Sequence, residues 1–254
     1  MRGIMAEGKK VYFLSDLHLG ARYFAGERAK ECAVVRWLDS VKHSAAEIYL
    51  LGDILDYWYE YRYVVPRGYV RFFGKLAELS DSGVKIHWFI GNHDIWIFDY
   101  LTTELGIEVV DGSVERNIMG KRFFLAHGDG VGRHSRTFAF LRSLFRNRFC
   151  QLLFAAIHPR WTIPFAHGWS KHSRQSHTEC CVPSEKAVRC IHDFAEEYSA
   201  KHKEIDYFVF GHLHLLEDAP LSDNARLIVL GDWITKNSYA EFDGEQLTLH
   251  RYEG

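Results

Sequence analysis

Seven side chains of types that bind metal ions follow five apolar runs in the sequence; five of them stand one or two residues after a run, and the other two stand two residues further on. The seven are Asp16, His18, Asp53, Asn92, His127, His212 and His214. The apolar runs predict buried strands, and functional side chains of layered α/β sheets gather at the carboxyl ends of strands. Each residue alone is typical of an ordinary turn. Their repetition at successive strand ends instead predicts one site built by a sheet.

The chemistry of this set points to two metal ions. It offers two carboxylates, one amide and four imidazoles, a mixture of donors that suits manganese, iron or zinc better than calcium or magnesium. Seven ligands exceed what one tetrahedral ion needs, but with one shared carboxylate they give each of two ions four ligands. Two ions ~3.5–4 Å apart can hold a bridging hydroxide and both oxygens of an in-line displacement at phosphorus. The set therefore predicts phosphoester hydrolysis.

The segment Asn92-His93-Asp94 carries two further candidates beside a predicted ligand. His93 is suited to donate a hydrogen bond or a proton to the leaving group, and Asp94 to orient His93. A lone surface histidine usually has no such role, but the neighbouring ligand favours one. We therefore predict that Asn92, His93 and Asp94 take part in catalysis.

The first half of the sequence alternates between strand and helix patterns. Continuous apolar runs predict strands, and apolar residues recurring at three and four predict helices. The predicted strands are 10–14, 47–51 and 84–90, and the predicted helices are 27–43, 70–79 and 96–105. The aromatic segment 56–63 between them is interpreted as a short helix and a loop, since Pro66-Arg67-Gly68 interrupts regular structure.

From residue 108 the pattern changes to strands joined by tight turns. A hairpin is predicted at 114–118 and 121–126 around Met119-Gly120, and a helix at 184–202 precedes the strand 207–210. The predicted C-terminal strands are 227–230, 238–242 and 246–251. Alternation followed by antiparallel strands predicts an α/β fold in which two sheet layers are flanked by helices.

A long interval separates His127 from His212. We interpret it as an insertion at about 133–183 in a single domain of residues 1–254. Residues 133–156 are basic, and their apolar residues recur at three and four, which predicts amphipathic helices. One interpretation is a lid over the site or a dimer contact in which the apolar stripe is simply part of the core.

Composition limits the class of protein. Of 254 residues, 47% are hydrophobic and 25% are charged, as in soluble globular proteins. The net charge of −2 argues against nucleic-acid binding by bulk charge. No signal peptide and no run of ~20 apolar residues is recognised, so a cytoplasmic protein is expected. The five cysteines lack a disulfide framework, and a zinc site at Cys180-Cys181 lacks a second ligand pair.

The strand-end motifs resemble the five blocks of the calcineurin-like metallophosphoesterase superfamily, in the same order. They are Asp16-x-His18, Gly52-Asp53, Gly91-Asn92-His93-Asp94, His127 and Gly211-His212-x-His214. The resemblance implies a four-layer α/β/β/α sandwich. It also implies that Asp53 bridges two metals, the first held with Asp16, His18 and His214, the second with Asn92, His127 and His212.

A narrower resemblance holds to the UDP-2,3-diacylglucosamine hydrolase family. It rests on the segments 15–19, 52–58 and 230–233 and on the insertion after His127. It implies cleavage of the UDP-2,3-diacylglucosamine pyrophosphate to lipid X (2,3-diacylglucosamine 1-phosphate) and UMP, by metal-activated water attack at the α-phosphorus. We expect two divalent ions, Mn2+ first among them. Well-known members carry Arg in place of His93, so the substrate is less determined than the metal chemistry.

The insertion favours a lipid-linked nucleotide as substrate. Its apolar residues suit an acyl pocket, and its basic residues suit phosphates or anionic headgroups at the inner surface of a membrane. The candidates for the pyrophosphate and headgroup are Arg133, Arg136, Lys171 and Arg174. Each is also compatible with a solvated surface charge.

Two alternatives remain, one of them another enzyme and the other a protein of a different functional class. A phosphodiesterase, nuclease or phosphatase acting on another nucleotide would keep the metal chemistry; nucleic-acid binding would be steeply salt-dependent, which the net charge does not favour. A metal-bearing scaffold without turnover would not need the complete ligand set.

Overall fold

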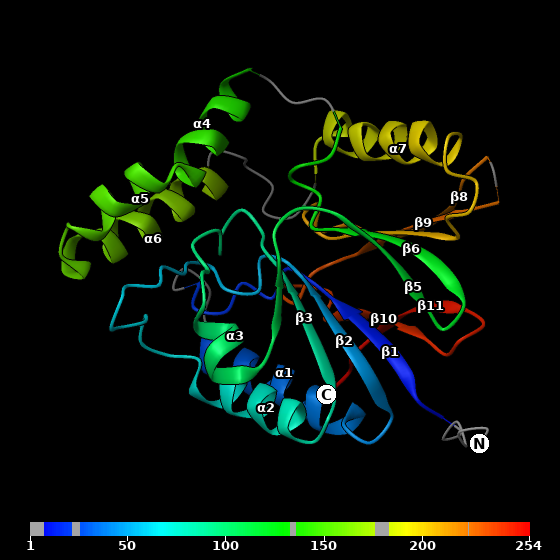
Figure 1. Cartoon of the computed structure of the whole chain (residues 1–254), viewed down its shortest axis with the longest axis horizontal. Helices are drawn as coiled ribbons and strands as arrows, with labels where there is room; N and C mark the ends of the chain where they lie inside the picture. Colours follow the sequence, from blue (N-terminus) through cyan, green and yellow to red (C-terminus); the bar gives the residue numbers. More distant parts are fainter. Residues whose placement is uncertain (1–7, 22–25, 133–135, 176–182, 223) are drawn as a thin grey trace.

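The computed structural model describes residues 8–21, 26–132, 136–175, 183–222 and 224–254, with the backbone alone for 136–139, 167 and 169–175. The first of its two sheets has the strand order β11-β10-β1-β2-β3-β4 (Figure 1). Four strands of this sheet are parallel, namely β1 (Lys10–Leu14), β2 (Ala45–Leu51), β3 (Lys85–Phe89) and β4 (Glu108–Val110). The antiparallel pair β10 (Ser238–Phe242) and β11 (Leu247–Arg251) completes it.

The second sheet has the order β5-β6-β7-β9-β8. Its three central strands are parallel, namely β6 (Lys121–Ala126), β7 (Tyr207–Phe210) and β9 (Arg226–Leu230). The edges are antiparallel, formed by β5 (Val114–Ile118) and β8 (Leu216–Pro220).

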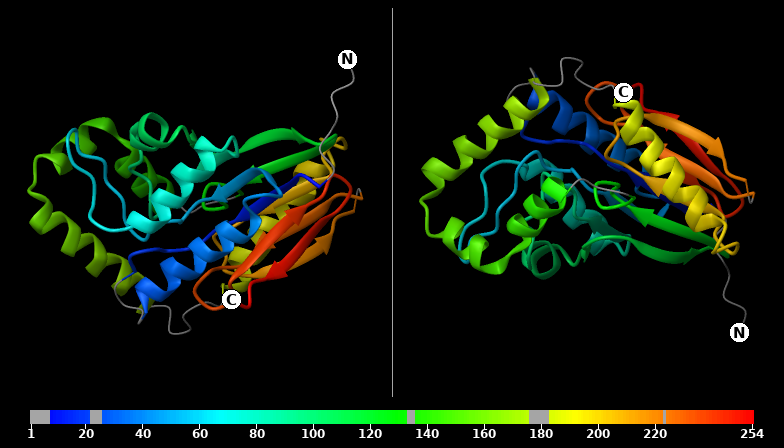
Figure 2. Two further views of the ribbon diagram at one scale, coloured as in Figure 1. Left: turned by 90° about the horizontal axis from the view of Figure 1, so that it is seen from below. Right: turned by 90° about the horizontal axis from the view of Figure 1, so that it is seen from above.

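Helices cover the outer face of each sheet, so the chain forms four layers (Figures 1 and 2). The first sheet packs on α1 (Glu27–Val41), α2 (Val70–Asp81) and α3 (Tyr100–Leu105), and the second on α7 (Glu185–Ser199). Successive strand residues point to opposite faces, so Tyr12 and Leu14 pack against the helices while Val11 and Phe13 pack against the second sheet. The predicted α/β/β/α sandwich is confirmed.

Three helices between β6 and α7 lie to one side of both sheets (Figures 1 and 2). They are α4 (Arg136–Arg146), α5 (Arg148–Ala155) and α6 (Pro159–Gln175), which we call the insertion helices. Asn147 begins α5, because its side chain accepts hydrogen bonds from the backbone N–H of Phe149 and Cys150. Their status as an insertion in one domain stays a prediction. Among the described residues, no helix has the length and apolarity to cross a bilayer.

The predictions for 56–63 and 96–105 differ from the structure at one shared point. Residues 56–63 contain no helix; Tyr59 instead forms a β-bridge with Trp96. The Glu60 carboxylate then accepts hydrogen bonds from the backbone N–H groups of Phe98 (2.6 Å) and Asp99 (2.9 Å), so α3 begins only at Tyr100. A long-range pairing therefore shortens the predicted helix at its N-terminal end.

Glu60→Ala should lower the free energy of unfolding by about 3 kcal/mol, because it leaves N–H donors without a charged acceptor. Glu60 is only 6% exposed, and its carboxylate also accepts from the Trp58 indole at 3.0 Å. Urea unfolding would measure the effect against Glu104→Ala, an exposed carboxylate of α3. Equal stabilities of the two variants would contradict the role given to Glu60.

Candidate metal centre

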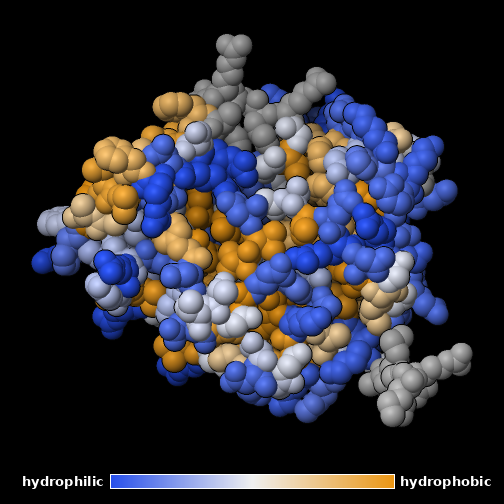
Figure 3. Space-filling model, in the orientation of Figure 1, coloured by the Kyte–Doolittle hydropathy of each residue, from blue (hydrophilic) through white to orange (hydrophobic). Residues whose placement is uncertain are grey.

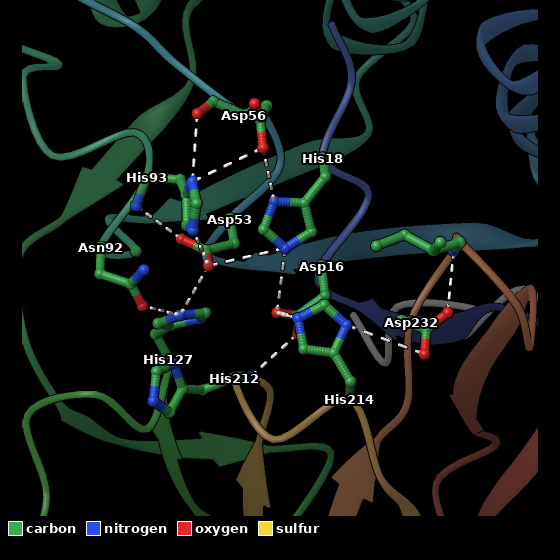
Figure 4. Close-up of polar contacts among 12 residues, drawn as sticks. Asp16, His18, Asp53, Asp56, Asn92, His93, His127, His212, His214 and Asp232 are labelled. Carbon is green, nitrogen blue, oxygen red and sulfur yellow. Dashed lines mark hydrogen bonds and ion pairs between the residues drawn. The ribbon is translucent and has the colours of Figure 1, made fainter. Parts of the chain in front are cut away.

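The seven predicted ligands converge from both sheets (Figure 4). Asp16 and His18 follow β1, Asp53 follows β2 and Asn92 follows β3 in the first sheet. His127 follows β6 and the pair His212 and His214 follows β7 in the second. The parallel strands of the two sheets thus bring together, at one edge, residues nearly two hundred positions apart, as the strand-end pattern predicts.

One group of ligand atoms consists of Asp16, His18 and His214, all within 4.8 Å of one another. Asp16 Oδ1 lies 3.7 Å from His18 Nε2 and 3.5 Å from His214 Nε2. Among the described residues this buried oxygen has no hydrogen-bond donor. A buried carboxylate oxygen that faces two imidazole nitrogens and no donor fits a divalent cation.

A second group consists of Asp53, His127 and His212, with Asn92 Oδ1 3.3 Å from His127 Nε2. His127 Nδ1 lies 2.8 Å from the carbonyl oxygen of Leu51. Because a carbonyl only accepts, Nδ1 carries a proton, and Nε2 is the nitrogen turned toward Asp53 at 3.5 Å. Asp53 Oδ2 also lies 3.7 Å from His18 Nε2, so this one carboxylate faces both groups.

The backbone of five predicted ligands lies in the left-handed region that favours glycine. Their φ values are 53° at Asp16, 43° at His18, 52° at Asp53, 66° at His212 and 52° at His214. Such conformations cost free energy and persist where surrounding contacts impose them, which is typical of functional sites.

Two glycines leave room for the ligands. A Cβ atom at Gly91 would lie 2.2 Å from Asp53 Oδ1, and one at Gly52 would lie 2.5 Å from His127 Nδ1. Both distances are far below van der Waals contact, so the side chains of the centre occupy the space that a larger residue would need. The glycines in the Gly-Asp and Gly-Asn-His-Asp motifs therefore have a packing reason.

Burial and charge set the protonation of the second group. Burial raises the pKa of the Asp53 carboxyl, but the charges of His127 and His93 outweigh it and hold that pKa well below its ordinary value. Burial lowers the pKa of His127, yet Asp53 raises it well above the usual range. Burial and His127 lower the pKa of His212 to about 4. Asp53 and His212 are thus already in the state that binds a cation, whereas His127 must give up a proton.

His93 lies at the margin of the centre, with Nε2 4.0 Å from Asp53 Oδ2. Its Nδ1 lies 3.1 Å from the backbone carbonyl oxygen of Asp56, so Nδ1 carries the proton and Nε2 faces the centre. The Asp56 carboxylate lies 3.6 Å from the same nitrogen. Asp56, rather than Asp94, is therefore the carboxylate beside the His93 ring.

Asp94 has a different position from the one predicted. Its fully buried carboxylate accepts hydrogen bonds from the backbone N–H of Gly91 (2.8 Å) and Ile54 (3.0 Å). Burial and the nearby Asp53 charge raise its pKa to about 6. Asp94 thus joins the loops that follow β2 and β3, and its hydrogen bonds hold the backbone of these loops, whereas Asp56 lies beside the His93 ring.

Asp56 and Asp232 are buried carboxylates that the ligand prediction missed. Asp56 Oδ1 lies 3.5 Å from His18 Nδ1, and Asp232 Oδ2 lies 3.8 Å from His214 Nδ1 (Figure 4). Both follow strand ends, Asp56 after β2 and Asp232 after β9. Asp232 stands two residues after the end of β9, which is the spacing of several predicted ligands, and Asp56 stands further along the loop after β2. The same strand-end pattern therefore marks both positions, but it does not indicate which group each carboxylate contacts.

The insertion helices dock on the loops that carry the site. The Trp96 indole donates to the Phe145 carbonyl oxygen (2.9 Å), and the Tyr59 hydroxyl donates to that of Gln151 (2.6 Å). Arg142 Nε lies 3.5 Å from Asp129 Oδ2, two residues after His127. Of the predicted substrate residues, Arg133 lies outside the described residues; α4 includes Arg136 and α6 includes Lys171 and Arg174, each with its backbone alone described.

The insertion helices also expose large apolar side chains. Figure 3 shows hydrophobic residues gathered at the upper left, over these helices. Phe149 and Trp161 are each 68% exposed. The other members of this exposed apolar set are Phe140, Leu141, Leu144, Phe145, Leu152, Leu153, Ile157 and Phe165. So many exposed apolar side chains on neighbouring helices mark an interaction surface.

Comparisons with known proteins agree with the motifs. A family model described as calcineurin-like phosphoesterase matches residues 9–216. The UDP-2,3-diacylglucosamine hydrolase of Porphyromonas gingivalis is 46% identical, over 96% of this chain and 98% of that protein. The proteins of the same name from Edwardsiella ictaluri and Neisseria meningitidis serogroup A are each 27% identical, over 93% and 91% of this chain and 90% and 92% of theirs. The resemblance predicted from the sequence is confirmed.

Proposed function

Because the chain belongs to the calcineurin-like phosphoesterase family, we propose that it is a metal-dependent hydrolase of UDP-2,3-diacylglucosamine, with 2,3-diacylglucosamine 1-phosphate and UMP as products. The observation that carries this proposal is the 46% identity to a UDP-2,3-diacylglucosamine hydrolase over 96% of the chain. The convergence of the seven predicted ligands supports the metal-dependent part of it.

The donor set indicates how two divalent cations would be held. Asp16, His18 and His214 would hold the first and Asn92, His127 and His212 the second, with Asp53 shared. When bound, such cations stabilise charge on the phosphoryl oxygens and lower the pKa of water toward neutrality. Nitrogen and oxygen donors together suit manganese, iron or zinc, and of these we propose Mn2+.

The chain's own residues complete the reaction. His93 directs Nε2 toward the centre, and in its imidazolium form, with a proton on each nitrogen, it would donate a hydrogen bond or a proton from Nε2 to the leaving phosphate. Asp94 and Asp56 fix the loops and the ring that set this direction. Catalysis therefore rests on the strand-end loops of both sheets.

The insertion helices are our candidate for contact with the lipid part of the substrate. Their exposed apolar set suits acyl chains, and the exposed arginines Arg148 and Arg160 beside it suit anionic headgroups. We place the protein in the cytoplasm, with peripheral contact at the inner membrane surface.

The direct test is incubation of the purified protein and Mn2+ with UDP-2,3-diacylglucosamine, followed by chromatography of the nucleotide product. UMP is expected, and a chelator should abolish its release. Bis(p-nitrophenyl) phosphate serves as a generic substrate. Turnover of that diester without any release of UMP would refute the substrate and favour another phosphodiester.

His93→Gln should lower kcat by about 10²–10⁴-fold, the range typical of general acid catalysis, with little effect on KM. Mn2+ content should stay the same, because His93 is outside the ligand set. His93→Arg, which keeps a cationic donor, should retain more activity. Steady-state kinetics of the three proteins would check this; a full kcat in His93→Gln would remove His93 from the mechanism.

A further inference from the structure

Asp232 is a buried carboxylate outside the predicted ligand set that faces one of the ligands. It is 0% exposed and lies in the loop after β9. Its Oδ2 is 3.8 Å from Nδ1 of His214, whose Nε2 is 3.5 Å from Asp16 Oδ1. Asp232 and the first ligand group thus lie at the two nitrogens of the same imidazole ring (Figure 4).

The loop holds this carboxylate in one orientation. Asp232 Oδ1 accepts hydrogen bonds from the backbone N–H of Ile234 at 2.8 Å and Thr235 at 2.6 Å. Lys236 Nζ donates to Oδ2 at 2.8 Å, leaving that oxygen shared between an ammonium and the imidazole. A carboxylate with this many donors stays ionised and does not rotate freely.

The same loop is fixed to the strand end that carries the first ligand. The backbone N–H of Trp233 donates to the carbonyl oxygen of Asp16 at 3.1 Å. Trp233 is 1% exposed and packs edge-on against Trp37, with the ring centroids 5.7 Å apart. Asp232 therefore has a defined position relative to Asp16 as well as to His214.

The second ligand group is supported differently. There His127 Nδ1 faces a neutral backbone carbonyl, that of Leu51. In the first group both imidazoles have a carboxylate at Nδ1, Asp56 for His18 and Asp232 for His214. A carboxylate at the remote nitrogen fixes the tautomer and makes the ligating nitrogen more basic.

We propose, on the ligand assignment of the proposed function, that Asp232 is a positioning residue that fixes the His214 ring and thereby strengthens the first cation site selectively. Outer carboxylates of this kind typically contribute 10–100-fold to metal affinity. The two cation sites therefore differ in affinity, and Asp232 contributes to the tighter one.

The test is a calorimetric titration of metal-free protein with Mn2+, which does not depend on the substrate. Asp232→Asn should weaken the tighter class of sites about 10–100-fold and leave the other unchanged. Asp218→Asn, the same charge change in a surface pair with Arg226, is the matched control and should bind like the wild type. Equal weakening of both classes, or no change in either, would overturn the proposal.

A double-mutant cycle assigns the effect to His214. In an Asn92→Ala background, Asp232→Asn should still weaken the remaining tight site. In a His214→Ala background it should have no further effect. An unchanged loss in the His214→Ala background would show that Asp232 does not act through this ring, and would overturn the proposal.

A measurement on the unmodified chain keeps the test independent of how the variants fold. In the metal-free protein at alkaline pH, nitrogen-15 NMR should find His214 as the Nδ1–H tautomer; the Nε2–H tautomer would overturn the proposal. Absence of UMP release would instead refute the proposed substrate, and it would not affect the conclusions from the calorimetric and NMR measurements, which do not use the substrate.

Discussion

Asp53→Asn should reduce kcat/KM by about 10³-fold or more. The change removes the one negative charge that lies 3.5 Å from His127 Nε2 and 3.7 Å from His18 Nε2, so both ligand groups lose it. Metal ions contribute several kcal/mol to such reactions, and about 4 kcal/mol corresponds to 10³-fold.

The fold should survive this substitution, because an asparagine oxygen can still accept the hydrogen bond that Asp53 Oδ1 receives from the His93 N–H at 2.8 Å. Kinetics with the diacylglucosamine substrate and metal analysis of the purified variant would measure the effect, with Asp218→Asn as a control for charge. Activity within tenfold of the wild type, at normal metal content, would be incompatible with Asp53 as the shared ligand.

Replacing Phe149 and Trp161 together with glutamate should reduce turnover of the diacyl substrate in vesicles by about 10²-fold. Both side chains are 68% exposed, so the change should have little effect on folding. Burial of each in lipid is worth about 1.5–3 kcal/mol, and about 3 kcal/mol in all corresponds to 10²-fold. Turnover of bis(p-nitrophenyl) phosphate should stay within twofold.

Met119→Glu is the control for this pair, since Met119 is 46% exposed in the β5–β6 turn, away from the insertion helices. Vesicle sedimentation would measure binding directly. If turnover of the diacyl substrate and of bis(p-nitrophenyl) phosphate fell by the same factor, Phe149 and Trp161 would be needed for the structure of the site and not for contact with lipid.

The ligands were predictable because their signal is local. Five predicted ligands stand one or two residues after an apolar run, and His18 and His214 stand two residues further on; the register of a parallel sheet then brings these positions to one edge. Asp16 and His214 lie at opposite ends of the chain, yet each is identified by its own strand. The two sheet layers were predicted from the alternation of strand and helix patterns followed by antiparallel strands, and the four-layer sandwich was implied by the family resemblance. The run Val11-Tyr12-Phe13-Leu14 is apolar throughout because both faces of β1 are buried, one against helices and one against the second sheet.

The departures arise where distant contacts decide local structure. The helical pattern of 96–105 gives no sign that Glu60 will accept the N–H groups of 98 and 99. The short edge strand β8 lacks a clear alternation, and β9 alone supports it. Pro164 lies inside α6, where a proline removes a hydrogen-bond donor and normally argues against helix. Asp56 and Asp232 were not predicted because each acts on Nδ1 of a ligand, His18 or His214, and the sequence does not indicate which carboxylate will face that nitrogen.

Each ligand group draws on both sheets: His214 of the second joins Asp16 and His18 of the first, and Asp53 of the first joins His127 and His212 of the second. On the proposed assignment, each cation would connect the two sheets through its ligands in addition to its role in catalysis. A cation that binds only the native state raises the free energy of unfolding by mass action. Depletion of divalent ions should therefore destabilise the packing of the two sheets against each other. The melting temperature of the protein would then rise with the concentration of divalent cations in the solution.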